Sequence, residues 1–422
     1  NSKDLFSDVL TSTEEERESY FTGHSKVLFS SGLESSTINK QSISDIKPWQ
    51  WSCPIPRLRI LIMIVGTRGD VQPFAILGMK LLADGHRVRL ATHETYRDYV
   101  INFGGGGLEF FPLAGDPVKL SEFMVKSQGN ILPTSAEVLK QVPENLSMLN
   151  EILKSCWPAC VETDPKVPNQ RKFKADVIIS NPVTYGHVHC AEALGIPLHL
   201  MFPQPWTPTK AFPHPLACFN YHNIKWSTEN YLSYQLVDRM LWLPLEPFIN
   251  SFRKNTLKLP PIRTGEHGWN LLNKYKVPFV KMWSKYLVPK PKDWGSHIDV
   301  VGFFFEDNNT NNNINNKNKD NNENKENKEN SEEQNNNNNQ TKMEFIHPSL
   351  PEPLKDYLHK GPKPIFVGFG SMIIENIEKI VETFIEASAL IGVRIIFQYG
   401  WTEINLEVFQ EICNKVSYKL QN

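Results

Sequence analysis

The sequence has no long apolar run, no excess of charge of either sign and no cysteine framework. No stretch of its 422 residues approaches the roughly 18 apolar residues that a membrane span needs, and no signal-peptide pattern opens it. The formal net charge of -1 gives no basic field, so we expect no nucleic-acid partner. Its six cysteines are scattered, with only Cys156 and Cys160 close in sequence, which favours reduced core thiols in a cytoplasmic protein.

Two phosphate-binding fingerprints are also missing, because the first glycine turn fits neither Gly-x-Gly-x-x-Gly nor a Walker sequence. What stands there is a short, β-branched apolar run at residues 60–65, which predicts a buried parallel strand. Gly66 and Gly69 bracket a tight turn, and a helix is predicted from Pro73 to Ala83. This strand, turn and helix indicate a doubly wound α/β domain, in which ligands bind beyond the carboxyl ends of the strands.

Asp70 and Arg68 lie in this turn, and two interpretations of Asp70 stay open. A carboxylate in the first helical turn would repel a bound phosphate, so it suits the role of accepting a proton from a neutral hydroxyl. Alternatively, Asp70 is an acid that the helix dipole favours at a helix N-terminus.

The α/β pattern continues along the chain. Strands and helices are predicted in alternation, with strands at 86–92, 108–113, 176–180 and 196–202 and helices at 96–103, 118–130, 135–160, 184–194 and 231–252. His187 and His189 are two residues apart on a predicted helix, so they cannot share a metal, and we expect one to be packed and one to face a cleft. The loop at 202–215 has five prolines and carries Trp206 and Phe212, which fits either an acceptor wall or an ordinary surface loop.

The chain divides into four predicted segments. Residues 1–55 are polar and are expected to be the tail of an upstream module with a linker, and residues 56–306 form the first domain. Residues 307–342, almost entirely Asn, Lys and Glu, predict a disordered insert. Residues 343–422 begin a second α/β domain, which we expect to be incomplete within this segment of a longer polypeptide.

The second domain opens like the first, with a buried strand followed by glycines. Gly370 and Ser371 can offer backbone N–H groups and a hydroxyl to a phosphate where a helix is predicted to begin. A helix at 377–391, a strand at 393–398 and a turn at 400–401 follow. Two such domains suggest a base in one and an anion site in the other.

A series of motifs in order along the chain resembles the sterol 3-beta-glucosyltransferases. The motifs are VGTRGDVQPF at 65–74, HRVRLATH at 86–93, NP at 181–182 with YGHVH at 185–189, PWTPT at 205–209, FPHP at 212–215, VPKP at 288–291 with DW at 293–294, and GFGSM at 368–372. The resemblance covers about residues 59–401 apart from the insert. It implies a GT-B fold, with an acceptor-binding N-terminal Rossmann-like domain and a donor-binding C-terminal one.

The resemblance also implies an activity: transfer of glucose from UDP-glucose to the 3-hydroxyl of a membrane sterol with inversion. Asp70 is then the catalytic base, with histidines 93, 187 and 189 as fallback bases, and no metal or other cofactor is needed. The implied donor-binding residues are Gly66, Thr67, Arg68, Asp70, Gly370, Ser371 and Trp401. The implied acceptor-binding residues are His93, His187, Trp206, Thr207 and Phe212.

Other interpretations remain. The chain could transfer sugar to another lipid or a small aglycone, since any apolar acceptor would favour the same aromatic and proline-rich wall. It could also be a non-catalytic lipid-binding relative; the discriminating feature is whether the continuation carries the donor signature of the family, of the His-Gly-Gly-Ala-Gly-Thr type, which is expected beyond the end of this sequence. Membrane association is expected to be peripheral and to come from upstream sequence, in a cytoplasmic protein.

Overall fold

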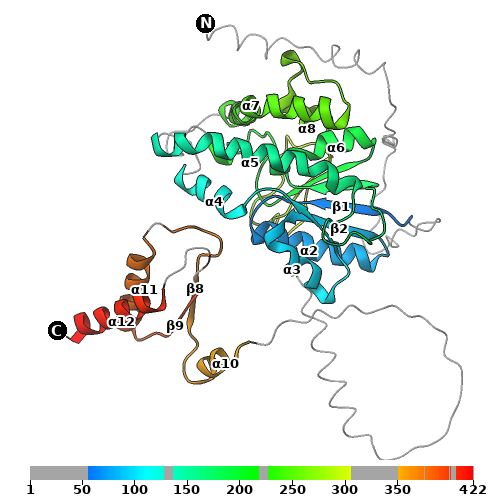
Figure 1. Ribbon diagram of the computed structural model, residues 1–422. Coiled ribbons are helices and arrows are strands. Elements are labelled where there is room, and N and C mark those ends of the chain that lie inside the picture. Colours follow the sequence, from blue (N-terminus) through cyan, green and yellow to red (C-terminus); the bar gives the residue numbers. More distant parts are fainter. Residues whose placement is uncertain are drawn as a thin grey trace, which may run out of the picture. The chain divides into compact units, whose positions relative to one another are not determined.

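The computed structural model describes residues 56–127, 136–217, 227–305, 350–374, 376–398, 400 and 405–421 (Figure 1). The predicted linker at 1–55, the predicted insert at 307–342 and Trp401 lie outside these residues. The two parts on either side of the predicted insert are described separately.

The first part is built on a seven-stranded sheet in which every neighbouring pair of strands is parallel. Its order is β3-β2-β1-β4-β5-β6-β7. The strands are β1 (Arg59–Met63), β2 (Arg87–His93), β3 (Glu109–Leu113), β4 (Val177–Ser180), β5 (Leu198–Phe202), β6 (Phe279–Lys281) and β7 (Ile298–Val300). The order reverses between β1 and β4, which makes the loops after these two strands the expected ligand crevice. The predicted doubly wound α/β domain is confirmed.

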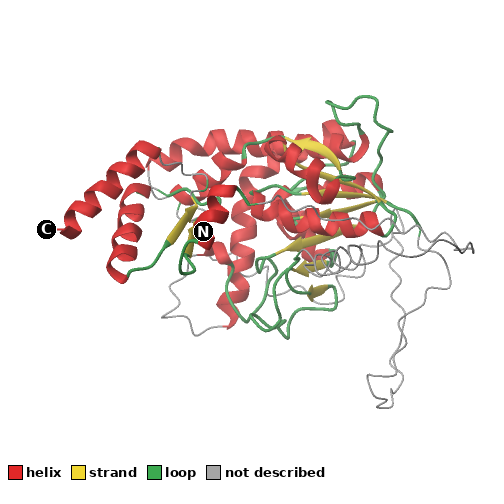
Figure 2. Cartoon of the chain, turned by 90° about the horizontal axis from the view of Figure 1, so that it is seen from below, coloured by secondary structure: helices red, strands yellow, loops and turns green. Residues whose placement is uncertain are grey.

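Helices cover both faces of this sheet (Figures 1 and 2). They are α2 (Arg68–Ala83), α3 (Arg97–Asn102), α4 (Pro117–Lys126), α5 (Ala136–Val161), α6 (His187–Leu194), α7 (Ser227–Ser251) and α8 (Leu271–Lys274). Alternate residues of β1 enter two different cores, as the two-residue period of a strand requires. Ile60 and Ile62 pack with α2 and α3, whereas Leu61 and Met63 pack with α5 and α6.

The core between the sheet and α5 contains three free, buried thiols. They belong to Cys156 and Cys160 on α5 and to Cys190 on α6. The backbone at Gly186 packs tightly against Cys156, because a Cβ added to Gly186 would lie 2.6 Å from the Cys156 Sγ. The expectation of core thiols is confirmed for these three.

Helix α2 begins at Arg68, five residues before the predicted start at Pro73, so that prediction was wrong. Thr67 is the N-cap, and Pro73 lies inside the helix, where it lacks the N–H that would bond to the preceding turn and its ring crowds the carbonyl group there. The predicted end is confirmed, since Asp84 is the C-cap and Gly85 follows with φ +88°.

The second part has two parallel strands, β8 (Ile365–Gly368) and β9 (Ile395–Gln398), with helices α10 (Glu352–His359), α11 (Ile377–Ile391) and α12 (Leu406–Gln421). Helix α12 was not predicted; its Ile412 and Val416 pack against Val381 of α11. The predicted helix at 377–391 is confirmed, since α11 has these bounds with Asn376 as its N-cap; only the expectation that a helix begins at the Gly370–Ser371 turn was wrong.

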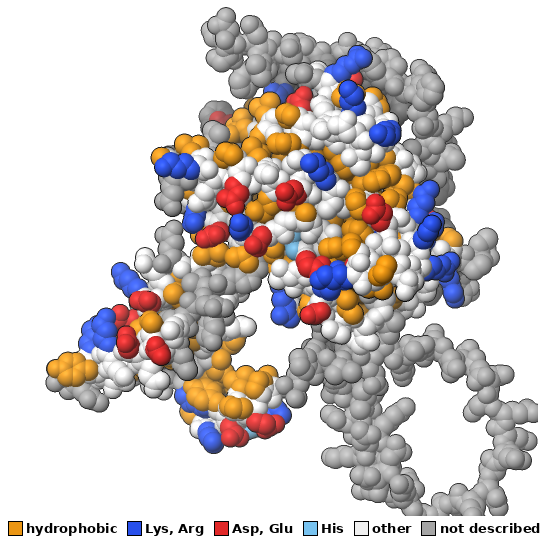
Figure 3. All heavy atoms as spheres, viewed as in Figure 1, with side chains coloured by type: hydrophobic (Ala, Val, Ile, Leu, Met, Phe, Trp, Pro, Cys, Tyr) orange, Lys and Arg blue, Asp and Glu red, His pale blue; other side chains and the backbone are white. Residues whose placement is uncertain are grey.

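Two surface properties bear on the expected partners. On the face seen in Figure 3, acidic and basic side chains are interspersed and form no field of one sign. No helix among the described residues is long and apolar enough to cross a bilayer.

Candidate functional site

The loop after β1 forms a tight turn at the point where the strand order reverses. Gly66 has φ +146°, and the Thr67 N–H donates a 2.7 Å hydrogen bond to Oδ2 of Asp70. The carboxyl group of Asp70 lies so close to Gly66 that a Cβ there would be 2.3 Å from Oδ2. Only glycine provides both the backbone angle and the space.

This turn is tied to the loop after β4 by Asn181, which is buried. Its Nδ2 donates a 2.7 Å hydrogen bond to the carbonyl oxygen of Val65, and its Oδ1 accepts one of 2.6 Å from the Thr184 hydroxyl. The two loops that border the crevice are therefore held in a fixed register.

His93, at the carboxyl end of β2, is hydrogen-bonded to the same turn. Its Nε2 accepts a 3.3 Å hydrogen bond from the Gly66 N–H, and its Nδ1 lies 3.0 Å from the carbonyl oxygen of Ala114. These contacts fit a neutral ring that carries its proton on Nδ1. Burial lowers the pKa of His93, and the side chain is inaccessible to solvent, so this residue positions the turn.

The carboxyl group of Asp70 is a stronger base than an exposed one. Burial raises its pKa, and the hydrogen bonds from Thr67 oppose that rise. The Tyr96 hydroxyl is affected by the same charge, since burial and the neighbouring Asp70 raise the pKa of Tyr96 to about 12. Asp70 also caps helix α2 through the bond to Thr67, so the structural and the chemical interpretations apply to the same carboxyl group.

The other residues predicted in this turn lie at its surface. Arg68 is exposed, with its guanidinium 4.6 Å from the ring centroid of Tyr99, and Thr67 is half-buried. An anionic ligand beside this turn would meet the Arg68 charge, while the N-terminus of α2 itself is capped by Asp70.

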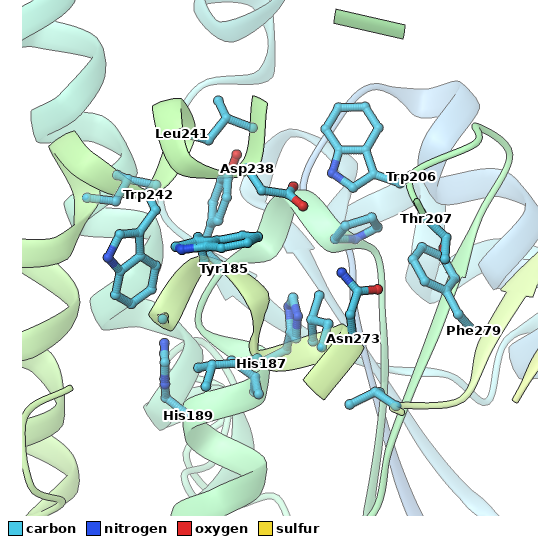
Figure 4. A pocket seen from close by; sticks show the side chains of 18 of the residues that line it. Tyr185, His187, His189, Trp206, Thr207, Asp238, Leu241, Trp242, Asn273 and Phe279 are labelled. Carbon is cyan, nitrogen blue, oxygen red and sulfur yellow. The ribbon is translucent and has the colours of Figure 1, made fainter. Parts of the chain in front are cut away.

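A cavity of about 100 Å³ lies between the sheet and helices α6, α7 and α8 (Figure 4). Three predicted acceptor residues line it: His187, Trp206 and Thr207. The other two, His93 and Phe212, are not among the lining residues, and the ring of Phe212 packs edge-on against Trp294 at 6.1 Å. Further aromatic lining comes from Tyr185, Trp242, Trp269 and Phe279.

Both histidines of the helix after β4 are buried, at 2% exposure for His187 and 1% for His189. Both also line the cavity, so the expectation of one packed and one cleft-facing histidine was wrong. Burial lowers the pKa of His187 to about 3. The pKa of His189 is lowered too, by burial and by Arg253, whose guanidinium donates to His189 Nδ1 at 3.0 Å.

Asp238 of α7 is a residue of this cavity that sequence reasoning missed. Its carboxyl group projects into the space between Tyr185 and Asn273 (Figure 4). Burial raises the pKa of Asp238 to about 8. The available signal was spacing, because Asp238 lies four residues after the buried Tyr234 and three before the lining residue Leu241, on the inward face of the helix.

The predicted donor residues of the second part lie beyond the carboxyl end of β8. Gly370 has φ +58° and, with Ser371, forms a turn there. Trp401 is not described. Within the described residues, no group of three or more His, Cys, Asp or Glu side chains could hold a metal ion.

Comparison with known proteins agrees with the motifs. Residues 60–213 match the glycosyltransferase family 28 N-terminal domain. The chain is 40% identical over 349 residues to the sterol 3-beta-glucosyltransferase UGT80A2 of Arabidopsis thaliana, covering 82% of this chain and 46% of that protein. It is 38% identical to UGT80B1 of the same plant, covering 82% and 48%. It is 31% identical to the UDP-sugar-dependent glycosyltransferase 52 of Dictyostelium discoideum, covering 84% and 18%.

The chain therefore spans less than half the length of these curated relatives, and its predicted resemblance to the sterol 3-beta-glucosyltransferases is confirmed. Among solved structures, the glycotransferase of kitacinnamycin aligns with a TM-score of 0.43 at 15% identity, covering 81% of this chain and 65% of that one.

Proposed function

We propose that this chain takes part in transferring glucose from UDP-glucose to the 3-hydroxyl of a membrane sterol, with Asp70 as the general base. The observation that carries this proposal is the half-buried Asp70 carboxyl group at the strand-order reversal, whose pKa is raised by burial. A carboxylate with a raised pKa accepts a proton from a hydroxyl more readily than an exposed one.

In the proposed reaction, each bond that forms is matched by one that breaks, and Asp70 takes up the proton. The sterol oxygen forms a bond to the anomeric carbon of glucose while the bond from that carbon to the UDP oxygen breaks, and the hydroxyl proton passes to Asp70. Attack opposite to the departing UDP inverts the configuration. Gly66, Thr67 and Arg68, with Gly370 and Ser371, are the proposed donor-binding groups; Trp401 is a further proposed one.

The cavity is the proposed acceptor site, because its walls are mainly apolar and aromatic. Its roughly 100 Å³ is below the roughly 300–1,000 Å³ of sites that hold drug-sized ligands, so the walls must move apart to admit a sterol. Helix α7, which contains Pro244 and Pro247, is the wall best suited to move, since two backbone hydrogen bonds are missing there. We further propose a cytoplasmic protein that reaches its membrane acceptor peripherally through upstream sequence.

Two other functions are compatible with the same cavity: sugar transfer to another lipid or small aglycone, and lipid binding without catalysis. The relatives favour the sterol, since the names of both Arabidopsis proteins specify a sterol 3-beta-glucosyltransferase. Incubating the full-length protein with UDP-[³H]glucose and a lipid extract discriminates among the three, because the labelled product identifies the acceptor and its absence indicates a non-catalytic protein.

The Asp70→Asn variant tests the role of the base directly. It should lose about 10²- to 10⁴-fold in rate, the usual contribution of a positioned general base, while UDP-glucose affinity changes little. Asp116→Asn is the matched control, since Asp116 also caps a helix after a parallel strand, accepting from the Val118 N–H at 2.8 Å. Near-normal turnover of Asp70→Asn would transfer the role to another residue.

A further inference from the structure

The cavity contains buried polar atoms with no partner among the described residues, although most of its wall is aromatic or aliphatic. Nδ1 of His187 and Oγ1 of Thr207 are buried and make no hydrogen bond to any residue that the structure describes. Both side chains line the cavity. Leaving such a group unsatisfied is unfavourable, so native proteins rarely keep several in one place without a ligand or water.

Asp238 adds a third polar group to the same space. Among the described residues, no hydrogen bond or ion pair reaches its carboxyl group, and the nearby lining residue Tyr185 supplies only an aromatic ring and a hydroxyl. A carboxyl group at this position, when protonated, offers one donor and one acceptor.

His189 presents a fourth polar group in a fixed orientation. Arg253 donates to its Nδ1, so in the neutral ring the proton is on Nε2. Arg253 is itself held by two bonds to Glu192, at 2.6 and 3.1 Å, and by one to the carbonyl oxygen of Pro260 at 2.9 Å. Its position is therefore overdetermined, and it fixes His189 as a lining residue with a donor on Nε2.

We infer that this cavity selects a polycyclic acceptor with a second hydroxyl group, in addition to the hydroxyl that receives the sugar. This inference rests on the proposed function in treating the ligand as an acceptor. A ligand hydroxyl both donates and accepts, so one such group can satisfy a donor and an acceptor of the wall together. A skeleton with a lone reactive hydroxyl, directed toward Asp70 outside the cavity lining, would leave these buried groups unpaired.

Binding without any sugar donor tests the inference separately from catalysis. Cholesterol is compared with 7α-hydroxycholesterol and 25-hydroxycholesterol by competition against tritiated cholesterol, using the full-length protein. At least one of the two diols should bind about 2- to 13-fold more tightly than cholesterol, which is the range of one net hydrogen bond. The three ligands share a ring system, so the comparison isolates the added hydroxyl.

Variants identify the responsible groups. Asp238→Leu should abolish the preference for the diol and leave cholesterol binding equal or stronger, because an apolar side chain removes an unpaired carboxyl group. Thr207→Val replaces the side chain by one of nearly equal shape and should reduce the preference for the diol by about 2- to 5-fold. This variant keeps the inference testable if Asp238→Leu fails to fold.

Three results would overturn the inference. The first is equal or weaker binding of both diols in the unmodified protein, which would mean that water satisfies these groups. The second is a preference for the diol that persists in both variants, and the third is no sterol binding at all. Failure of the proposed function gives a different pattern, namely preferential diol binding with no transfer of labelled glucose to any sterol.

Discussion

Gly66 is the position where a one-carbon change should reach the proposed chemistry most directly. In Gly66→Ala, the new Cβ would fall 2.3 Å from Oδ2 and 2.7 Å from Cγ of Asp70. No non-bonded carbon approaches an oxygen that closely, so the carboxyl group must move. The move breaks the 2.7 Å bond from the Thr67 N–H and takes the carboxylate out of its place in the turn.

Two contributions determine how much stability Gly66→Ala loses. Holding alanine at φ +146° costs about 1–3 kcal/mol, as for other residues in sparsely populated backbone regions. Losing the cap interaction of Asp70 adds about 0.5–2 kcal/mol. Stability should therefore fall by about 1.5–5 kcal/mol. Transfer should fall about 100-fold, because a displacement near 1 Å can cost that much.

The matched control is Gly195→Ala. Gly195 also has a positive φ, +65°, at the C-cap of α6, but nothing lies within 4 Å of an added Cβ. This control should cost about 1–2 kcal/mol, the strain of a left-handed L-residue, and leave transfer unchanged. Urea unfolding midpoints and initial rates of labelled glucose transfer measure both effects. Equal destabilisation of the two variants together with full activity of Gly66→Ala would refute the reasoning.

Two further changes have defined outcomes. Arg253→Lys should lower stability by about 1.5–3 kcal/mol, because a point charge cannot replace the paired bonds to Glu192 and the bond to His189; a thermal melt indistinguishable from wild type would contradict this. Asp238 has a folded pKa of about 8, above its ordinary value of 3.8, so its protonation stabilises the fold fully below about pH 4 and that contribution is lost as the pH rises through 8. Urea midpoints from pH 5 to 8 should consequently fall less steeply in Asp238→Asn than in the wild type, and parallel curves would show that Asp238 titrates normally.

Much of the sheet could be predicted from the sequence, because buried parallel strands are continuous apolar runs. The run at 60–65 and the glycine turn after it located β1 and the site loop without any tertiary information. The start of α2 could not be located this way, since proline usually marks a first turn and here lies within the helix. Thr67 and Asp70, three residues apart, were the better signal.

The candidate site was only partly predictable. Trp206, Thr207 and His187 meet in one cavity, and the sequence identified all three, but Asp238 was missed although its helical spacing was a signal. An acid next to an arginine in a long helix is normally solvated, so its inward position follows from how α7 packs against the sheet. The burial of His187 and His189 likewise follows from tertiary packing, since α6 is covered by other elements and His189 is bonded to Arg253.

The three buried thiols between α5 and the sheet can report when the α5 layer separates from the sheet. Cys156, Cys160 and Cys190 come from two helices and are all closed to solvent. Burial raises the pKa of Cys156 beyond its ordinary range, which keeps the sulfur as an unreactive thiol. An alkylating reagent can therefore modify these sulfurs only after the α5 layer separates from the sheet. The rate at which the reagent modifies them therefore measures how often that separation occurs in the native protein, with no residue changed.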